Sequence, residues 1–156
     1  MELSRFIKRE RIILDMKSRD RWSALGELLE KVLPAGSKEY ENVLKTLRDS
    51  ESRKCSAVGR CIIIAHAVSS AVKDIVVVMG RSRQGIPWRA PDGRMVNIMW
   101  LFIHPAGKPD RYLELLSQTM KICRRNESWN KLVKASEADG IIEMIARAEE
   151  RKKPRG

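Results

Sequence analysis

Three short apolar runs near the middle of the chain limit its fold more than any other feature. They read CIII at 61–64, DIVVVMG at 74–80 and MVNIMWLFI at 95–103. The first two are rich in β-branched residues and too short for most helices, which is typical of buried strands. The third run is equally apolar and stops at Pro105-Ala106-Gly107. We therefore expect three strands at the centre of the fold.

Apolar residues recur at helical spacing both before and after these runs. The expected helices are 19–33, a segment after Ser37, 109–125, 127–134 and a segment that opens at Ser136. Ser18 and Ser37 suit N-cap positions, and Pro109 suits the first position of a helix. Helices, then strands, then helices again indicate an α/β (α+β) protein, with a mixed β-sheet flanked by helices.

The remaining segments are expected to be irregular. Residues 49–60 show no periodicity and predict a loop, and 81–94 predict a loop with a tight turn at 91–93. Residues 1–17 mix apolar and charged side chains and predict an N-terminal arm packed on the body. The basic tail, 150–156, is predicted to be flexible. Without an internal repeat or a linker, 1–156 is predicted to form a single domain.

Composition argues against several classes of protein. No apolar run approaches the ~20 residues that cross a bilayer, and the charged N-terminus lacks the features of a signal peptide. These features predict a cytoplasmic protein with no membrane insertion. The three cysteines form no C-x-x-C pair, and the only histidines are His66 and His104. We therefore expect no disulfide framework, no metal site and no cofactor.

The net charge of +11 raises the question of a nucleic-acid partner. The excess of Lys and Arg is spread along the chain, and only 5% of the residues are aromatic. A surface for stacking bases combines a basic groove with aromatic side chains, so nucleic-acid binding is not expected. A solvated basic surface is the favoured interpretation, and attraction of acidic partners stays open.

His66 is the residue that best suits chemistry. A polar loop containing Gly59 leads into the apolar run, and that run ends at the histidine. An imidazole with an unperturbed pKa of about 6.5 is mostly neutral at cytosolic pH and is therefore nucleophilic. This suits reversible capture of a phosphoryl group, which also needs backbone N–H groups or a cation nearby. The alternative is a buried histidine with a purely structural role.

The stretch CSAVGRCIIIAHA at 55–67 resembles the phosphorylation motif of type-2 enzyme IIA domains of the bacterial sugar phosphotransferase system, S-T-G-I-G-x-G-[IV]-A-[IL]-P-H-[AG]. Further similarities follow in the same order. Four further segments each resemble a segment of that family: the helix 19–33, GIPWRAPDGRMVNIMWLFIHPAG, YLELLSQTMKICRR and SEADGIIEMI. The resemblance covers nearly the whole chain. It is to the family that contains the fructose, mannitol and nitrogen-regulatory IIA domains.

The resemblance implies a three-layer fold of the phosphotransferase/anion-transport-protein type. It also implies that His66 takes a phosphoryl group from the phosphocarrier protein HPr. The group is then passed to a IIB domain or used as a signal. A free-standing IIA domain points to the nitrogen-regulatory branch, whose members bind regulatory target proteins according to their phosphorylation state.

The sequence departs from the family pattern around the histidine. Ala65 replaces a proline, Ala57 and Cys61 replace glycines, Ser50 stands where the family has an arginine, and Tyr112 stands where it has a second histidine. A serine cannot replace the bidentate cationic group of an arginine. The residues expected to support a phosphate pocket are Ser50, Arg48, Arg53, Ser56, Arg60, Tyr112 and His104. Among these, an arginine could restore the charge, and Tyr112 could donate a hydrogen bond.

These departures keep a second hypothesis open, namely a degenerate IIA-like module that binds proteins without being phosphorylated. Other classes fit less well. The chain has no G-x-S-x-G motif for a hydrolase. Strand alternation places Cys61 and His66 on opposite faces, which argues against a thiol nucleophile activated by this histidine. His104, at the far end of the third strand, is expected either in the pocket or beside a surface turn.

Overall fold

A computed structural model describes residues 2–107 and 109–151 of the chain. Two short 3-10 helices, η1 and η2, precede the first strand. The elements are η1 Leu3–Arg5, η2 Arg9–Arg11, β1 Ile12–Ile13, α1 Arg21–Leu29, α2 Lys38–Arg53, β2 Ala57–Gly59, β3 Ile62–Val68, β4 Val76–Ile86, β5 Val96–His104, α3 Pro109–Cys123, α4 Asn126–Lys134 and α5 Ala138–Glu150.

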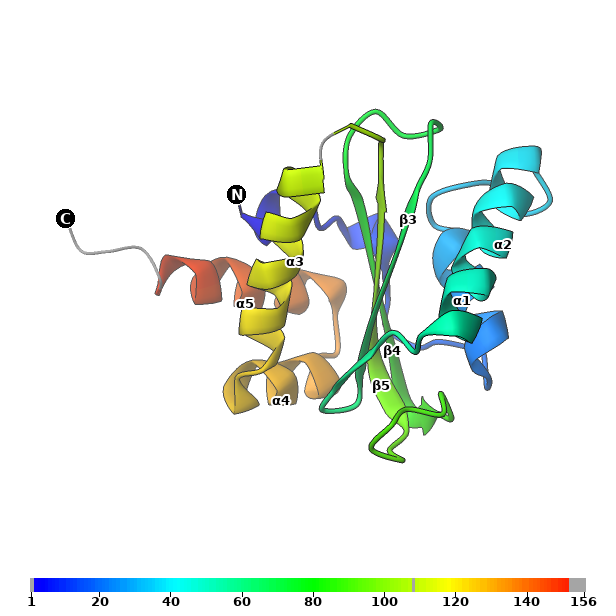
Figure 1. The fold of residues 1–156 in the computed structure, drawn as a ribbon. Coiled ribbons are helices and arrows are strands. Elements are labelled where there is room, and N and C mark those ends of the chain that lie inside the picture. Colours follow the sequence, from blue (N-terminus) through cyan, green and yellow to red (C-terminus); the bar gives the residue numbers. More distant parts are fainter. Residues whose placement is uncertain (1, 108, 152–156) are drawn as a thin grey trace.

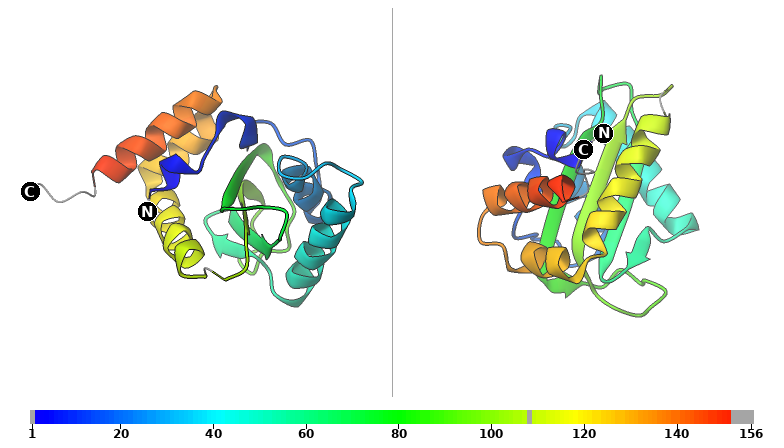
Figure 2. Two further views of the ribbon diagram at one scale, coloured as in Figure 1. Left: turned by 90° about the horizontal axis from the view of Figure 1, so that it is seen from above. Right: turned by 90° about the vertical axis from the view of Figure 1, so that its left-hand side faces the viewer.

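The five strands form one sheet in the order β1-β4-β5-β3-β2. Strand β5 pairs parallel with β3 and antiparallel with β4, and β2 pairs antiparallel with β3. Helices α1 and α2 cover one face, and α3, α4 and α5 cover the other (Figures 1 and 2). The prediction of a mixed sheet flanked by helices is confirmed.

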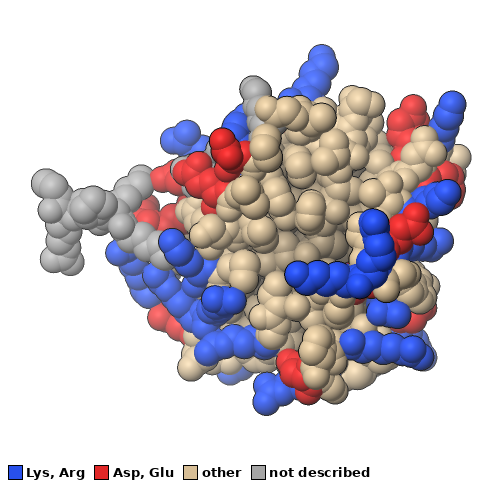
Figure 3. Space-filling model, viewed as in Figure 1, with Lys and Arg blue, Asp and Glu red and all other residues tan. Residues whose placement is uncertain are grey.

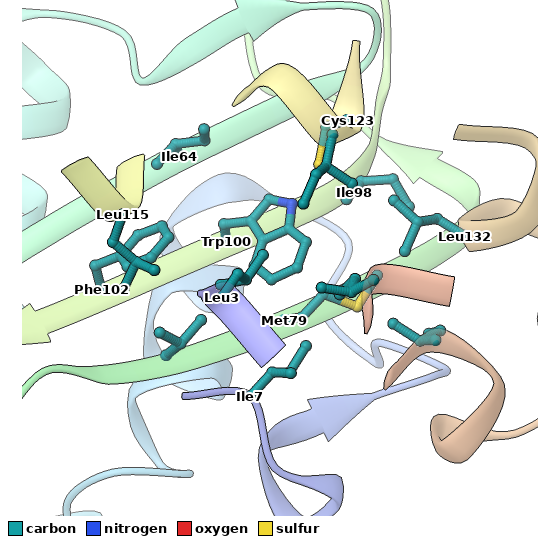
Figure 4. Packing of buried hydrophobic residues seen from close by; sticks show 14 of the residues in the cluster. Leu3, Ile7, Ile64, Met79, Ile98, Trp100, Phe102, Leu115, Cys123 and Leu132 are labelled. Atoms are coloured by element: carbon teal, nitrogen blue, oxygen red, sulfur yellow. The ribbon is translucent and has the colours of Figure 1, made fainter. Parts of the chain in front are cut away.

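Strand alternation divides the apolar side chains between two cores, one on each face of the sheet. Ile62 and Ile64 point into the core beneath α3–α5, whereas Ile63 and Ala65 point into the core beneath α1 and α2. Trp100 lies at the centre of the first core among side chains from the sheet, from the N-terminal arm and from α3 (Figure 4). Because both faces of the sheet are buried, its strands read as continuous apolar runs.

The N-terminal arm packs on the body, as predicted. Leu3 and Ile7 are buried in the core beneath α3–α5. The Glu149 carboxylate in α5 accepts hydrogen bonds from the amide and the hydroxyl of Ser4, at 2.9 and 2.6 Å. The arm also supplies β1, a short parallel edge strand that the sequence did not predict.

Several predicted boundaries were wrong. Helix α2 continues to Arg53, through the start of the predicted loop 49–60, and β2 occupies the end of that loop. Strand β4 continues to Ile86, well into the predicted loop 81–94. The tight turn is confirmed, since the Gly93 amide donates to the Ala90 carbonyl at 2.9 Å. The residues at the ends of α2 and β4 are mostly polar and show no apolar periodicity of their own. The sequence therefore did not show that they continue the helix and the strand.

The predicted caps had mixed outcomes. Ser37 caps α2 by accepting a hydrogen bond from the Tyr40 amide. Asp20, not Ser18, caps α1, which also ends earlier than predicted, at Leu29. Glu137, not Ser136, is the N-cap of α5. Most of the tail predicted to be flexible, residues 152–156, lies outside the described residues. No helix in the described ranges is long and apolar enough to cross a membrane.

Candidate functional site

His66 is exposed near the end of β3, although Ala65 and Ala67 on either side of it are buried. In the parallel pairing with β5, His66 lies opposite Phe102 and Val68 lies opposite His104. Alternation places His66 on the same face as Ile62 and Ile64, which is the face covered by α3. The imidazole therefore lies where the apolar layer beneath α3 meets solvent.

Two further rings stand beside it. The ring centroid of Tyr112, in the first half of α3, lies 4.8 Å from that of His66, and the planes differ by 28°. His104 lies 4.6 Å from Tyr112 in a nearly parallel stack and 5.9 Å from His66. Both Tyr112 and His104 are buried. The three side chains come from β3, β5 and α3, so only the tertiary fold brings them together. We call them the ring cluster.

A cavity of about 430 Å³ opens beside His66, between α2 and α3 at the β2 edge of the sheet. Its lining is mixed, with apolar side chains around a small number of polar ones. The lining residues are Leu47, Ser50, Glu51, Lys54, Cys55, Ser56, Ala57, Val58, Ile64, Ala65, His66, Tyr112, Leu116 and Met120. Such a pocket, with few polar groups placed on apolar walls, is typical of ligand sites.

The environment keeps His66 and Tyr112 uncharged near neutral pH. Partial burial lowers the pKa of His66 below its usual 6.5, and the neighbouring His104 lowers it further. Burial raises the pKa of Tyr112 to about 12. His66 is therefore a neutral nucleophile with a free electron pair, and Tyr112 keeps its O–H proton for donation.

Two buried polar atoms near the site have no hydrogen-bond partner in the described part of the chain. They are the Ser56 hydroxyl oxygen and the His104 Nε2. His104 Nδ1 lies 3.3 Å from the Pro105 carbonyl; with the proton on Nδ1, the carbonyl accepts a hydrogen bond from it and Nε2 is left as an acceptor. A buried polar atom left unpaired costs roughly 1–3 kcal/mol, and such atoms in native proteins often mark a functional position.

Glu51 brings a buried carboxylate to the cavity wall. Its oxygens accept hydrogen bonds from the Ser56 amide at 3.2 and 3.3 Å, and Oε1 accepts one from the Trp88 indole N–H at 2.7 Å. These bonds fix the turn that leads from α2 into β2.

The structure brings some of the predicted pocket residues to His66 and leaves others away from it. Ser50, Ser56 and Tyr112 line the cavity, and His104 belongs to the ring cluster. None of the three arginines suggested as a replacement cation lines it.

Each of these arginines has another location. Arg48 lines a separate cavity formed by α1, α2 and residues 13–18. The Arg60 guanidinium donates to the Arg124 carbonyl and, at 2.9 Å, to the Asn126 side chain. Arg53 is exposed at the end of α2, outside the cavity lining.

Lys54 and Glu51 also line the cavity, and sequence reasoning missed both. The signal that could have found them is the amphipathic pattern of α2. Continuing the helix past residue 49 places Leu47, Ser50, Glu51 and Lys54 at spacings of three and four residues, on one face. Among the described residues, no group of three or more His, Cys, Asp or Glu side chains is placed to hold a metal ion.

Solved enzyme IIA proteins share this fold. The nitrogen regulatory protein IIA-Ntr of Neisseria meningitidis superposes with a TM-score of 0.83 at 20% identity, covering 92% of this chain and 98% of that one. The mannitol enzyme IIA of Escherichia coli, solved in complex with phosphorylated enzyme IIB, gives a TM-score of 0.76 at 14% identity, covering 90% and 97%. At these identities the likeness defines the class of fold, not the activity.

The sequence matches the family described as phosphoenolpyruvate-dependent sugar phosphotransferase system, EIIA 2, over residues 5–148. The chain belongs to this family. It is 24% identical to the fructose-specific EIIABC component of Bacillus subtilis over 146 residues, which is 93% of this chain. It spans only 23% of the length of that relative. The resemblance drawn from the motif around His66 is thus confirmed for the chain as a whole.

Proposed function

We propose that this protein is a phosphocarrier of the phosphotransferase system and that His66 is its phosphoacceptor. The observation that carries the proposal is an exposed imidazole, with its pKa below 6.5, at the rim of a partly polar cavity. The family membership reported above supports the same role. HPr is the donor that this family implies. The acceptor is either a IIB domain or, in a regulatory role, a target protein.

The proposed step is a reversible phosphoryl transfer. The electron pair of one ring nitrogen of neutral His66 attacks the phosphorus atom held by the donor protein. A P–N bond forms as the bond between phosphorus and the donor atom breaks, and the donor atom keeps that electron pair. The reverse process delivers the group to the acceptor. Positioning and charge stabilisation dominate such transfers, so rigid support of His66 matters more than added covalent chemistry.

The ring cluster suits that supporting role. Tyr112 packs against the His66 ring and limits its rotation, while its protonated hydroxyl is available to donate a hydrogen bond to a phosphoryl oxygen. His104 stacks on Tyr112 and holds it in turn. The N-terminal end of α3, from which Tyr112 comes, carries partial positive charge that favours an anion nearby.

The surface around His66 suits transfer between proteins. Val68 and Leu113, which are 51% and 54% exposed, flank the ring cluster along β3 and α3. The face between α2 and α3 is largely free of charged side chains, and Lys and Arg gather at its margins (Figure 3). An apolar centre with a charged rim is the usual composition of a transient protein interface. With HPr as the proposed donor, we propose that the protein acts in the cytoplasm.

The main alternative is a regulator that binds proteins without taking a phosphoryl group. The observation that favours it is a cavity lined by Glu51 but by no arginine. On that alternative, His66→Ala binds the same partner protein as the wild type, with equal affinity whether or not phosphoenolpyruvate is supplied.

The deciding experiment is incubation of the protein with phosphoenolpyruvate, enzyme I and HPr, followed by intact mass measurement. We expect the wild type to gain the mass of one phosphoryl group and His66→Ala to gain none. His104→Gln tests the other histidine: it is expected to carry the adduct at the end of the reaction because the nucleophile is still in place, although loss of the ring that stacks on Tyr112 can change the rate. A wild type that stays unmodified, or an adduct that survives in His66→Ala, contradicts the proposal.

A further inference from the structure

The cavity beside His66 has few positively charged side chains with which to bind a phosphoryl group. A phosphoryl group carries roughly two negative charges at neutral pH, and its oxygens need donors or cations around them. Helix α2 ends at the cavity, and the C-terminal end of a helix bears partial negative charge. Glu51 adds a carboxylate to the same wall. Without a compensating cation, these groups oppose phosphorylation of His66.

Lys54 is the one Lys or Arg among the described residues that line this cavity. It follows the last residue of α2, and its amide donates to the Ser50 carbonyl at 2.9 Å, which fixes where its side chain starts. The side chain itself is exposed. Its ammonium group forms no hydrogen bond or ion pair within the described ranges, so it is available to an incoming anion.

Glu51, one helical turn before Lys54, forms no ion pair with it in the described part of the chain. The carboxylate is 4% exposed and is already bonded to the Ser56 amide and the Trp88 indole. A lysine ammonium is a compact charge on a flexible four-carbon chain, so it can follow the phosphoryl group from an open to a bound position.

We propose that Lys54 supplies the cation that binds the phosphoryl oxygens on His66, in place of an arginine at position 50. This inference rests on the proposed function of His66 and names the cation that stabilises the phosphoryl group there. Lys54 contacts the transferred group, so its charge acts on the reaction itself. Arg53, beside it in sequence and also exposed, lies outside the cavity and carries no such role.

The test compares Lys54→Gln with the matched variant Arg53→Gln, since both remove one charge from the same helix end. Phosphorylation by HPr is followed at increasing HPr concentration in 0.15 M salt. We expect Lys54→Gln to lower the maximal rate by about tenfold to a hundredfold, which is less than the loss of a preorganised donor from a buried site because the Lys54 side chain is exposed. Arg53→Gln is expected to stay within about twofold, because Arg53 lies outside the cavity lining and salt screens its charge from the phosphoryl group. Lys54→Arg is expected to recover most of the rate.

Three outcomes overturn the inference. Lys54→Gln reacts as fast as the wild type, or both glutamine variants slow equally, or Lys54→Gln changes only the HPr concentration needed for half-maximal rate. Either of the last two results means that Lys54 helps HPr to bind the basic surface and does not act on the transferred group. A wild type that takes no phosphoryl group refutes the function of His66 instead, so the two failures are distinguished. Circular dichroism of each variant confirms that the comparison concerns folded protein.

Discussion

At the scale of single residues, His66 differs from an ordinary surface histidine because two other rings lie beside it. Tyr112 packs against it at 4.8 Å, and His104 lies 5.9 Å away. This partial burial disfavours the imidazolium, and a second imidazole close by disfavours it further. The same contacts that limit the motion of the ring therefore also keep its nitrogen free for reaction.

We expect the pKa of His66 to lie below 6.5 and to rise in His104→Gln without fully reaching that value, because burial is the larger cause. Ring-proton NMR across pH 4–8 measures both proteins. The folded state binds this proton more weakly than the unfolded chain does, so the contribution of His66 to stability falls as the pH drops below 6.5. The phosphorylation rate is expected to fall over the same pH range, because the protonated imidazole has no free electron pair for the attack. A value at or above 6.5 in the wild type contradicts the prediction.

At the scale of elements, one buried arginine joins three parts of the fold. Arg81 of β4 is 1% exposed. Its guanidinium donates to the Leu14 carbonyl in the N-terminal segment and to the carbonyls of Leu132, Val133 and Ala135 at the end of α4. Cations stabilise the C-terminal ends of helices, where carbonyl groups lack partners. Arg81 therefore holds the arm and α4 against the sheet.

We expect Arg81→Met to lower the free energy of unfolding by about 2–4 kcal/mol, because it leaves several buried carbonyls without a donor. Urea unfolding followed by circular dichroism measures the loss. Arg83→Met is the matched control. Its side chain is exposed on the same strand, so a change within about 0.5 kcal/mol is expected. Equal losses in the two variants would exclude the role assigned to Arg81.

At the scale of the whole molecule, one sheet joins the two cores. Leu28 of α1 is fully buried on one face, and Leu115 of α3 is fully buried on the other. Both cores share the strands β3, β4 and β5, so lost packing in one core weakens the sheet on which the other core also depends. The sequence-based prediction of a single domain can be tested through this coupling.

We expect Leu28→Ala and Leu115→Ala each to lower the free energy of unfolding by about 2–5 kcal/mol, the usual range for a buried leucine. Tryptophan fluorescence and circular dichroism should report the same midpoint in each variant, since a single domain of this size unfolds in one transition. Separate transitions in either variant would contradict the single-domain prediction.

The sequence was sufficient for features that depend on neighbours in the chain. Apolar runs located the three main strands, and Ser37 marked the start of α2. The motif around His66 led to the correct family over nearly the whole chain. Periodicity and capping act over a few residues, so they can be read without knowledge of the fold.

The tertiary structure alone decided which side chains surround His66. His104 and Tyr112 join it through the register of β3 with β5 and the placement of α3. Arg48 and Arg60 turn to other surfaces, and Lys54 takes the cavity because α2 runs on to Arg53. A long side chain near a site in sequence can point in any direction. The direction depends on where the helix that carries the side chain ends against the sheet. The sequence near the site does not contain this information.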